Sequence, residues 1–83
     1  MKMPLPIDDA IIPVVDPCRP LACPAIYDAS RPFEVEVGCG KGRFLAGRAA
    51  RHPECEYLGI ERMLDRVRSF ARKVARGALA NAH

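Results

Sequence analysis

The sequence predicts an α/β fold in which parallel strands are joined through a helix. Two observations lead to this expectation. A strand-like segment, FEVEV, runs directly into a turn with three glycines, and strand-like and helix-like segments then alternate along the chain. A strand, helix, strand order within one sheet requires a right-handed crossover between parallel strands. With 83 residues the chain can form at most one small domain with a marginal core.

The chain divides near residue 31 into two parts of different composition. Seven of the eight prolines lie in residues 1–32, and proline at that density excludes a continuous helix or a central strand. We therefore expect residues 1–31 to form a proline-rich arm, with a short turn or helix near residues 27–30. Residues 32–83 are expected to form the folded, ligand-binding part.

Four segments make up this second part. Residues 33–37 alternate apolar and acidic side chains, which is the period of two typical of a strand. A helix is expected over about residues 42–51, because the residue before Pro53 is disfavoured in a helix. Residues 56–60, EYLGI, predict a second strand. Apolar side chains recur at helical spacing from about residue 63 to residue 79.

Composition excludes several classes of protein. No apolar run approaches the roughly 20 residues that span a bilayer, and Asp8, Asp9 and early prolines interrupt any signal peptide. We therefore expect a cytoplasmic protein without a membrane partner. The net charge of +3 is compatible with a polyanionic partner but does not identify one.

The four cysteines do not form a recognisable metal or disulfide pattern. Cys18 and Cys23 are separated by four residues, and the other gaps are of fifteen residues each. A structural zinc site usually has two such closely spaced ligand pairs, with ligands two to four residues apart. Only Cys18 with Cys23 comes near that spacing, and His52 and His83 stand apart. We expect reduced thiols and no metal.

The glycine turn carries the main functional signal. Gly38, Gly40 and Gly42 form GxGxG at a junction between a strand and a helix. Glycine allows a tight turn there and lets a ligand approach the backbone without meeting a Cβ atom. The first N–H groups of the following helix point toward the same crevice.

Glu61 strengthens this signal by its position at the end of the second strand. It follows Gly38 by 23 residues, and a carboxylate at about this distance can accept hydrogen bonds from ribose hydroxyls. The alternative is that Glu61 only favours the start of the next helix, where negative charge is stabilised.

The residues around the turn narrow the choice of ligand. A dinucleotide fingerprint would place a third glycine where Arg43 stands, and the GK[ST] ending of a P-loop is absent. Glu36 lies two residues before the first glycine, where a carboxylate suits a cationic group better than a pyrophosphate. S-adenosylmethionine offers an ammonium, a sulfonium and a ribose without phosphate. The alternative for Glu36 is a surface position on an edge strand.

The segments EVEVGCGKGRF and LGIER, followed by a basic amphipathic helix, resemble the bacterial tRNA (guanine-N7)-methyltransferases over residues 32–80. This resemblance implies a Rossmann-like fold of S-adenosylmethionine-dependent methyltransferases, of which the chain holds the first βαβα portion. It places Glu36, Gly38, Gly40, Gly42 and Glu61 at cofactor-binding positions.

The resemblance also implies a reaction, namely methyl transfer to N7 of guanine 46 in tRNA. That nitrogen has a lone pair and needs no general base, so catalysis depends on holding donor and acceptor in line, and no catalytic residue is assigned. The family's guanine-binding and tRNA-binding residues come from later segments. We therefore expect an incomplete fragment that is inactive alone, with the family continuing from Asn81 into a third strand.

Several side chains allow two interpretations. The cations of the last helix could contact tRNA phosphates or form a solvated face: Arg62, Arg66, Arg68, Arg72, Lys73 and Arg76. Lys41 and Arg43 could likewise meet a phosphate or only keep the turn soluble. We expect Cys39 to be a small filler, and Tyr57 and Phe70 to lie in the core. A non-catalytic RNA-binding or interaction fragment is the alternative function, and a fragment without function of its own is the third.

Overall fold

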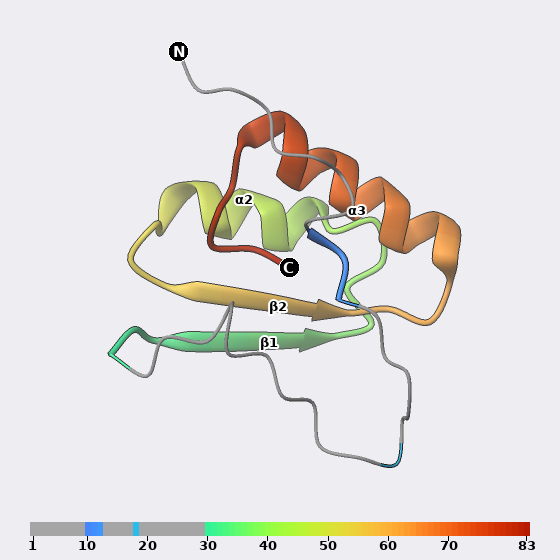
Figure 1. Cartoon of the computed structure of the whole chain (residues 1–83), viewed down its shortest axis with the longest axis horizontal. Helices are drawn as coiled ribbons and strands as arrows, with labels where there is room; N and C mark the ends of the chain where they lie inside the picture. The colour runs from blue at the N-terminus through green and yellow to red at the C-terminus, as the bar shows by residue number, and fades with distance from the viewer. Residues whose placement is uncertain (1–9, 13–17, 19–29) are drawn as a thin grey trace.

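The computed structural model describes residues 10–12, 18 and 30–83, which form two strands and two helices (Figure 1). The elements are β1 (Phe33–Val37), α2 (Arg43–Arg51), β2 (Glu56–Ile60) and α3 (Leu64–Gly77). The strands are parallel, with registers from Phe33 opposite Glu56 to Val37 opposite Ile60. The predicted α/β fold and element order are confirmed. Most of the expected arm, including most of its expected turn, lies outside the described residues.

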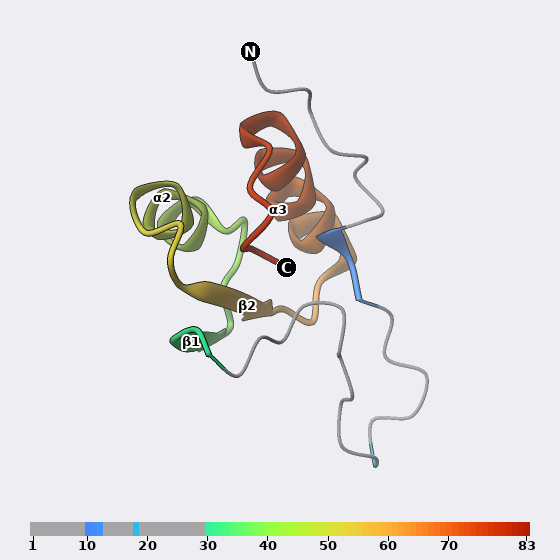
Figure 2. The same cartoon turned by 60° about the vertical axis from the view of Figure 1, so that its left-hand side comes forward.

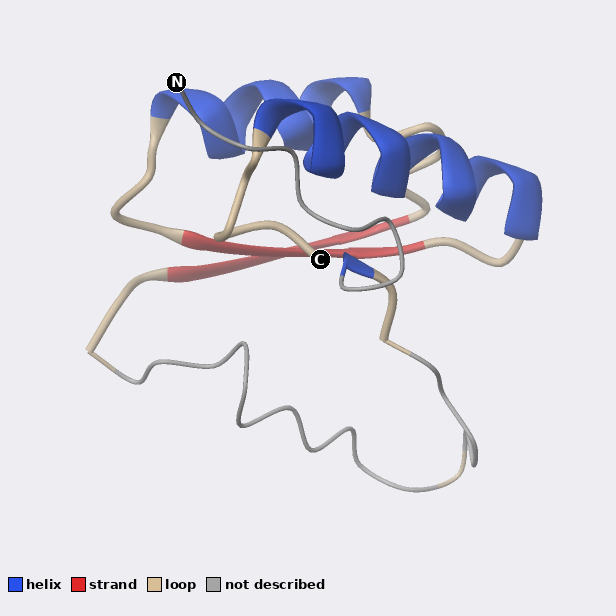
Figure 3. Cartoon of the chain, turned by 45° about the horizontal axis from the view of Figure 1, so that its top comes forward, coloured by secondary structure: helices blue, strands red, loops and turns tan. Residues whose placement is uncertain are grey.

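Both helices cover the same face of the sheet (Figures 1 and 3). The core between the helices and the sheet is made of alanine, larger aliphatic and aromatic side chains, and Tyr57 and Phe70 are 1% and 5% exposed. The prediction that these two aromatic residues are core residues is therefore confirmed. The other buried core residues are Ala10, Leu45, Ala49, Ala71, Val74 and Ala82. No helix within the described ranges is both long and apolar enough to cross a membrane.

Helical periodicity alone misplaces a few side chains. Phe44, Met63 and Leu64 share the apolar spacing of their helices but are 62%, 43% and 57% exposed. They lie at or just before the first turn of α2 or α3, at the carboxyl end of the strands, where no described element covers them. Ala75 of α3, which lies outside the apolar spacing of positions 63, 64, 67, 70, 71, 74 and 78, is buried. The burial of an apolar side chain in these helices therefore depends on whether a neighbouring element extends far enough to cover it. The periodicity of the sequence contains no information about this.

The face of β1 opposite the helices is apolar and open. Phe33, Val35 and Val37 are 36%, 49% and 79% exposed, and Ile60 of β2 is 47% exposed. The alternating pattern of β1 therefore places its glutamates, not its apolar residues, on the side of α2.

Residues 81–83 run alongside β2 on the side away from β1. Ala82 is bridged in parallel to Tyr57. The Tyr57 N–H donates to the Asn81 carbonyl at 2.7 Å, and the His83 N–H donates to the Tyr57 carbonyl at 3.0 Å. This direction and position agree with the expected third strand that begins at Asn81. Figure 2 shows residues 10–12 beside α3 and this last segment.

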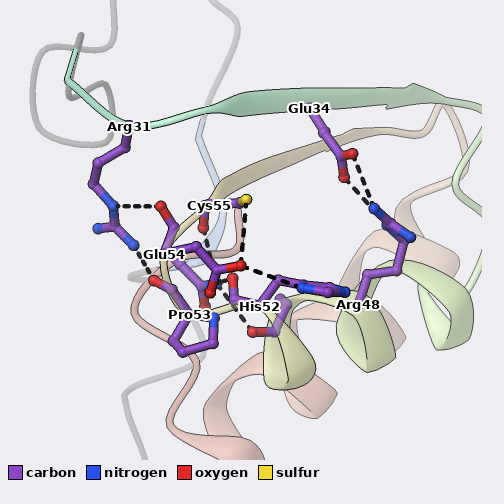
Figure 4. Close-up of polar contacts among 9 residues, drawn as sticks. Arg31, Glu34, Arg48, His52, Pro53, Glu54 and Cys55 are labelled. Atoms are coloured by element: carbon purple, nitrogen blue, oxygen red, sulfur yellow. Dashed lines mark hydrogen bonds and ion pairs between the residues drawn. The ribbon is translucent and has the colours of Figure 1, made fainter.

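Arg31 fastens the segment before β1 to the start of β2 (Figure 4). Its Nη1 atom lies 2.7 Å from Oε1 of Glu56, and its Nε atom donates to the carbonyl of Glu54 at 3.2 Å. Its Nη2 atom donates to the carbonyl of Pro53. Glu56 is only 6% exposed, so its carboxylate has a charged partner where little water reaches it.

Two further contacts hold α2 at the same end. The Arg48 guanidinium donates to both carboxylate oxygens of Glu34, at 3.2 and 3.0 Å (Figure 4). The buried amide of Asn81 donates to three carbonyl oxygens, those of Ala49, His52 and Cys55, at 3.0, 3.1 and 2.9 Å. Asn81 therefore joins the end of α2, the following turn and the start of β2.

Candidate functional site

The glycine turn between β1 and α2 is built on three residues with positive φ. The φ angles of Gly38, Gly40 and Gly42 are 76°, 60° and 74°. Side chains are strained in this left-handed region, which glycine enters freely. The Gly38 N–H donates to the Ile60 carbonyl at 2.7 Å, so the turn lies directly against the end of β2.

The three glycines differ in what surrounds them. A Cβ atom at Gly38 or Gly40 would meet nothing within 4 Å. A Cβ atom at Gly42 would lie 2.8 Å from Cβ of Phe70 and closer still to its ring. Packing therefore explains why Gly42 must be glycine, whereas Gly38 and Gly40 leave bare backbone beside open space.

Glu61 is hydrogen-bonded to this turn. Its Oε1 atom accepts the Gly40 N–H at 3.1 Å, and its Oε2 atom accepts the Met63 N–H at 2.9 Å. The bond to Met63, the bond to Gly40 and the nearby Arg66 charge hold the pKa of the Glu61 carboxyl below its usual range. A carboxylate offers about four lone-pair sites. One site on each oxygen is therefore left for a ligand with two neighbouring donors.

The two interpretations of Glu61 are thus not exclusive. The bond to Met63 lies at the residue that precedes α3, as the helix-start interpretation requires. The bond to Gly40 connects the ends of β1 and β2 across the crevice, which helix capping does not require. Its role toward a ribose stays a prediction.

Glu36 lies on the side of β1 that faces α2. It is half-buried and borders a groove together with Leu45 and Phe44 of α2. Its carboxylate has no hydrogen bond or ion pair within the described part of the chain. Its charge still reaches the turn, since Glu36 and Glu61 both contribute to the pKa of the Cys39 thiol. Its cofactor-binding role also stays a prediction.

Cys39 fills the space beneath the turn. Burial, followed by the charges of Glu36 and Glu61, raises the pKa of its thiol. A thiol with a raised pKa stays protonated and is a poor nucleophile, which favours the filler interpretation. A Cβ atom at Gly59 would lie 2.6 Å from the Cys39 sulfur and 2.8 Å from Cε2 of Phe70. The importance of Gly59 was not predicted, because nothing local in EYLGI marks it.

A mainly apolar pocket of about 130 Å³ adjoins Glu61. Cys39, Gly59 and Glu61 form its side nearest the turn, and Phe70 of α3 is also in its lining. Residues 10–12 and His83 contribute as well. These contributions come from distant parts of the chain, so sequence spacing gives no signal for the pocket.

Lys41 and Arg43 are exposed at the start of α2. The Lys41 carbonyl accepts a hydrogen bond from Nζ of Lys73 at 3.0 Å, so a side chain of α3 binds the backbone of the turn. Neither interpretation of these two cations is tested by this contact.

No group of three or more potential metal ligands occurs among residues 10–12, 18 and 30–83. Cys39 and Cys55 are free thiols, and Cys23 lies outside the described residues.

Comparison with known proteins identifies the family. Residues 30–83 match a family model described as "Putative methyltransferase". The tRNA (guanine-N(7)-)-methyltransferase of Cutibacterium acnes is 36% identical over 74 residues, which are 89% of this chain and 27% of that protein. The enzyme of the same name from Lactococcus lactis subsp. cremoris is 52% identical over 45 residues, 54% of this chain and 20% of that protein. The one from Leuconostoc mesenteroides is 39% identical over 49 residues, 59% and 22% respectively.

The chain thus spans about a quarter of the length of these curated relatives. The family match covers the whole of β1, the glycine turn, α2, β2 and α3. The expected resemblance is confirmed: the chain belongs to this methyltransferase family, and bacterial tRNA (guanine-N7)-methyltransferases are among its relatives.

Proposed function

We propose that residues 32–83 are the methyl-donor-binding part of a tRNA (guanine-N7)-methyltransferase, preceded by the arm of residues 1–31, and that the donor is S-adenosylmethionine. The partner would be tRNA, and the site of action the bacterial cytoplasm. The names of the relatives support the reaction.

One observation carries the proposal. The bare backbone of Gly38 and Gly40 faces open space, and the Glu61 carboxylate is bonded to that backbone with acceptor sites to spare. Vicinal ribose hydroxyls present two neighbouring donors, which is the pattern that these free sites fit. The apolar pocket beside Glu61 suits a flat base attached to that ribose.

Within the described residues Glu36 has no hydrogen bond or ion pair, because Arg48 in the same groove is paired with Glu34, and this also supports the proposed donor. A half-buried carboxylate without an ion pair can interact with the ammonium or sulfonium of S-adenosylmethionine, and opposite charges attract strongly where water is partly excluded. Gly42 would contribute through the shape of the turn, because Phe70 packs where its side chain would be.

S-adenosylmethionine supplies an electrophilic methyl group when it is bound. The residues of this chain would hold the donor by its ribose and its charged end, so that the methyl group is fixed in direction. The guanine N7 lone pair needs no base, and orientation alone can supply a large part of the rate enhancement. This account needs no nucleophile from the turn, which agrees with a protonated Cys39.

The binding half of the proposal can be tested on the 83-residue chain itself. A titration with S-adenosylmethionine, followed by amide chemical shifts, should move the signals of Gly38, Gly40 and Glu61. Signals at the other end of the strands, such as those of Arg31 and Glu56, should stay in place. Unchanged glycine signals at saturating donor would contradict the proposal.

The reaction itself requires the remaining segments of the relatives. We would replace the matched 45 residues of the Lactococcus lactis enzyme with the corresponding residues of this chain and measure methyl transfer to an unmodified tRNA transcript. Activity of this chimera that is abolished by Glu61→Ala would support the proposal. An inactive, folded chimera would argue that these residues no longer bind the donor productively.

A further inference from the structure

Helix α3 has a larger net positive charge than the whole chain. It contains one acid, Asp65, and five cations: Arg66, Arg68, Arg72, Lys73 and Arg76. It therefore has four positive charges in excess, whereas the chain has a net charge of +3. The helix macrodipole favours cations only near the carboxyl end, and only Arg76 lies in the last turn. The macrodipole therefore does not explain the other four cations of α3.

Three of these cations form one row. Arg68, Arg72 and Arg76 follow one another every four residues, so they lie about 6 Å apart along the axis and turn only about 40° at each step. Phe70 and Val74 are buried on another side of the helix. Lys73 reaches toward the glycine turn through its bond to the Lys41 carbonyl. The row, which we name the arginine row, therefore points away from both the sheet and α2.

The arginine row is exposed and uncompensated. All three side chains are exposed, and none has a hydrogen bond or ion pair within the described part of the chain. Like charges at this spacing destabilise a helix slightly. A row that costs stability and has no partner among the described residues favours an external partner.

We propose that the arginine row binds the phosphate backbone of the RNA substrate. The identity of the partner as RNA rests on the proposed function. Arginine forms planar, two-point hydrogen bonds to phosphate, and a row of such groups along one helix fits a polyanionic strand that runs beside it. The helix begins beside Glu61, so RNA along the row would lead toward the proposed donor site.

A membrane surface fits this row less well. Helices that lie on membranes insert large apolar side chains next to their basic face. The large apolar residues in the middle of α3, Phe70 and Val74, are buried against the protein core. The exposed large apolar residues, Met63 and Leu64, stand only at the start of α3, so most of the arginine row has charge without an apolar neighbour.

The test measures how binding of a fluorescent, unmodified tRNA transcript depends on salt. Each phosphate contact of a single strand contributes about 0.7 to the slope of log K against log salt. The double variant Arg68→Gln/Arg72→Gln should lower this slope by about 1.4. The matched control compares two single variants. Arg72→Gln should lower the slope by about 0.7, whereas Arg51→Gln, at an exposed position on α2 outside the row, should change it much less.

Several results would overturn the proposal. These are no tRNA binding by the unaltered chain at about 50 mM salt, an unchanged slope in the row variant, or an equal loss in the α2 control. Tighter, row-dependent binding to phosphatidylserine vesicles than to tRNA would assign the row to a membrane instead. Arg68→Lys/Arg72→Lys keeps the charge and should keep the slope. If the glutamine pair loses the helical circular dichroism signal, each single substitution should still lower the slope by about 0.7.

The same variants separate this inference from the proposed function. The row variant should shift the same amide signals with S-adenosylmethionine as the unaltered chain. Failure of that titration in the unaltered chain, with the row effect intact, would refute the donor site and leave the arginine row standing as an RNA-binding surface.

Discussion

The two ends of the parallel sheet are built in opposite ways. At the amino end, Arg31, Arg48 and Asn81 each make two or more hydrogen bonds that tie separate segments together. At the carboxyl end, the backbone of Gly38 and Gly40 borders open space. The side-chain bonds of Glu61 to Gly40 and Met63 cross that end.

Within a very small domain, this difference separates the contacts that hold the fold from the proposed ligand site. A crevice that leaves backbone bare for a ligand cannot also be filled with stabilising side chains. The amino end holds the strands and α2 in register, so that the carboxyl end can stay open. The same division is general in open α/β sheets, where ligands bind outside the carboxyl ends of the strands.

Two glycines of one turn provide the largest expected contrast. Gly42→Ala combines a left-handed backbone with a collision against Phe70, and should lower the free energy of unfolding by about 2–5 kcal/mol. Gly40→Ala has the same backbone strain but open space around it, and should cost only about 1–2 kcal/mol. Urea denaturation measures both. Equal losses would mean that Phe70 adapts and that Gly42 is not a packing residue.

Asn81→Ala should have the next largest effect. It removes the donors of three carbonyl groups at the amino end, and buried acceptors left without partners cost about 1–3 kcal/mol. Arg51→Ala, at an exposed position on α2, is the control and should change the midpoint of thermal unfolding very little. A small change for Asn81→Ala would show that water replaces the amide and that the amino end is less closed than described.

The smallest effect concerns the ion pair between Glu34 and Arg48. The Arg48 guanidinium lowers the pKa of the Glu34 carboxyl from its ordinary value of 4.5. The pair therefore contributes stability above that value, and the contribution is lost as the pH falls through the lowered pKa. Glu34→Gln should lower the unfolding temperature slightly near neutral pH. The difference should vanish in strong acid and shrink with added salt. A constant difference at every pH would point to lost packing.

Sequence reasoning succeeded where the information is local. Alternation in FEVEV and the glycines after it gave the bounds of β1 and the turn, and Pro53 marked the end of α2 near His52. The positions of Glu61 and Gly40 at neighbouring strand ends followed from the rule for parallel sheets. Their direct hydrogen bond, however, depends on atomic geometry that spacing does not contain.

The remaining features depend on contacts between distant residues. The role of Gly42 is set by Phe70, and the role of Asn81 by carbonyl groups on α2 and β2. Neither partner is marked by a local pattern. The exposure of Met63 and Leu64 likewise reflects which elements stand beside α3. These contacts between distant residues cannot be derived from a single sequence.

The central claim is that the carboxyl end binds the methyl donor while the amino end only supports the fold. Its most direct test compares two carboxylates, one at each end, by equilibrium dialysis with S-adenosylmethionine. Glu61→Gln should weaken donor binding at least about tenfold, the equivalent of one lost charge-assisted hydrogen bond. Glu34→Gln should leave it unchanged. Undiminished donor binding by Glu61→Gln, or an equal loss in both variants, would contradict the account.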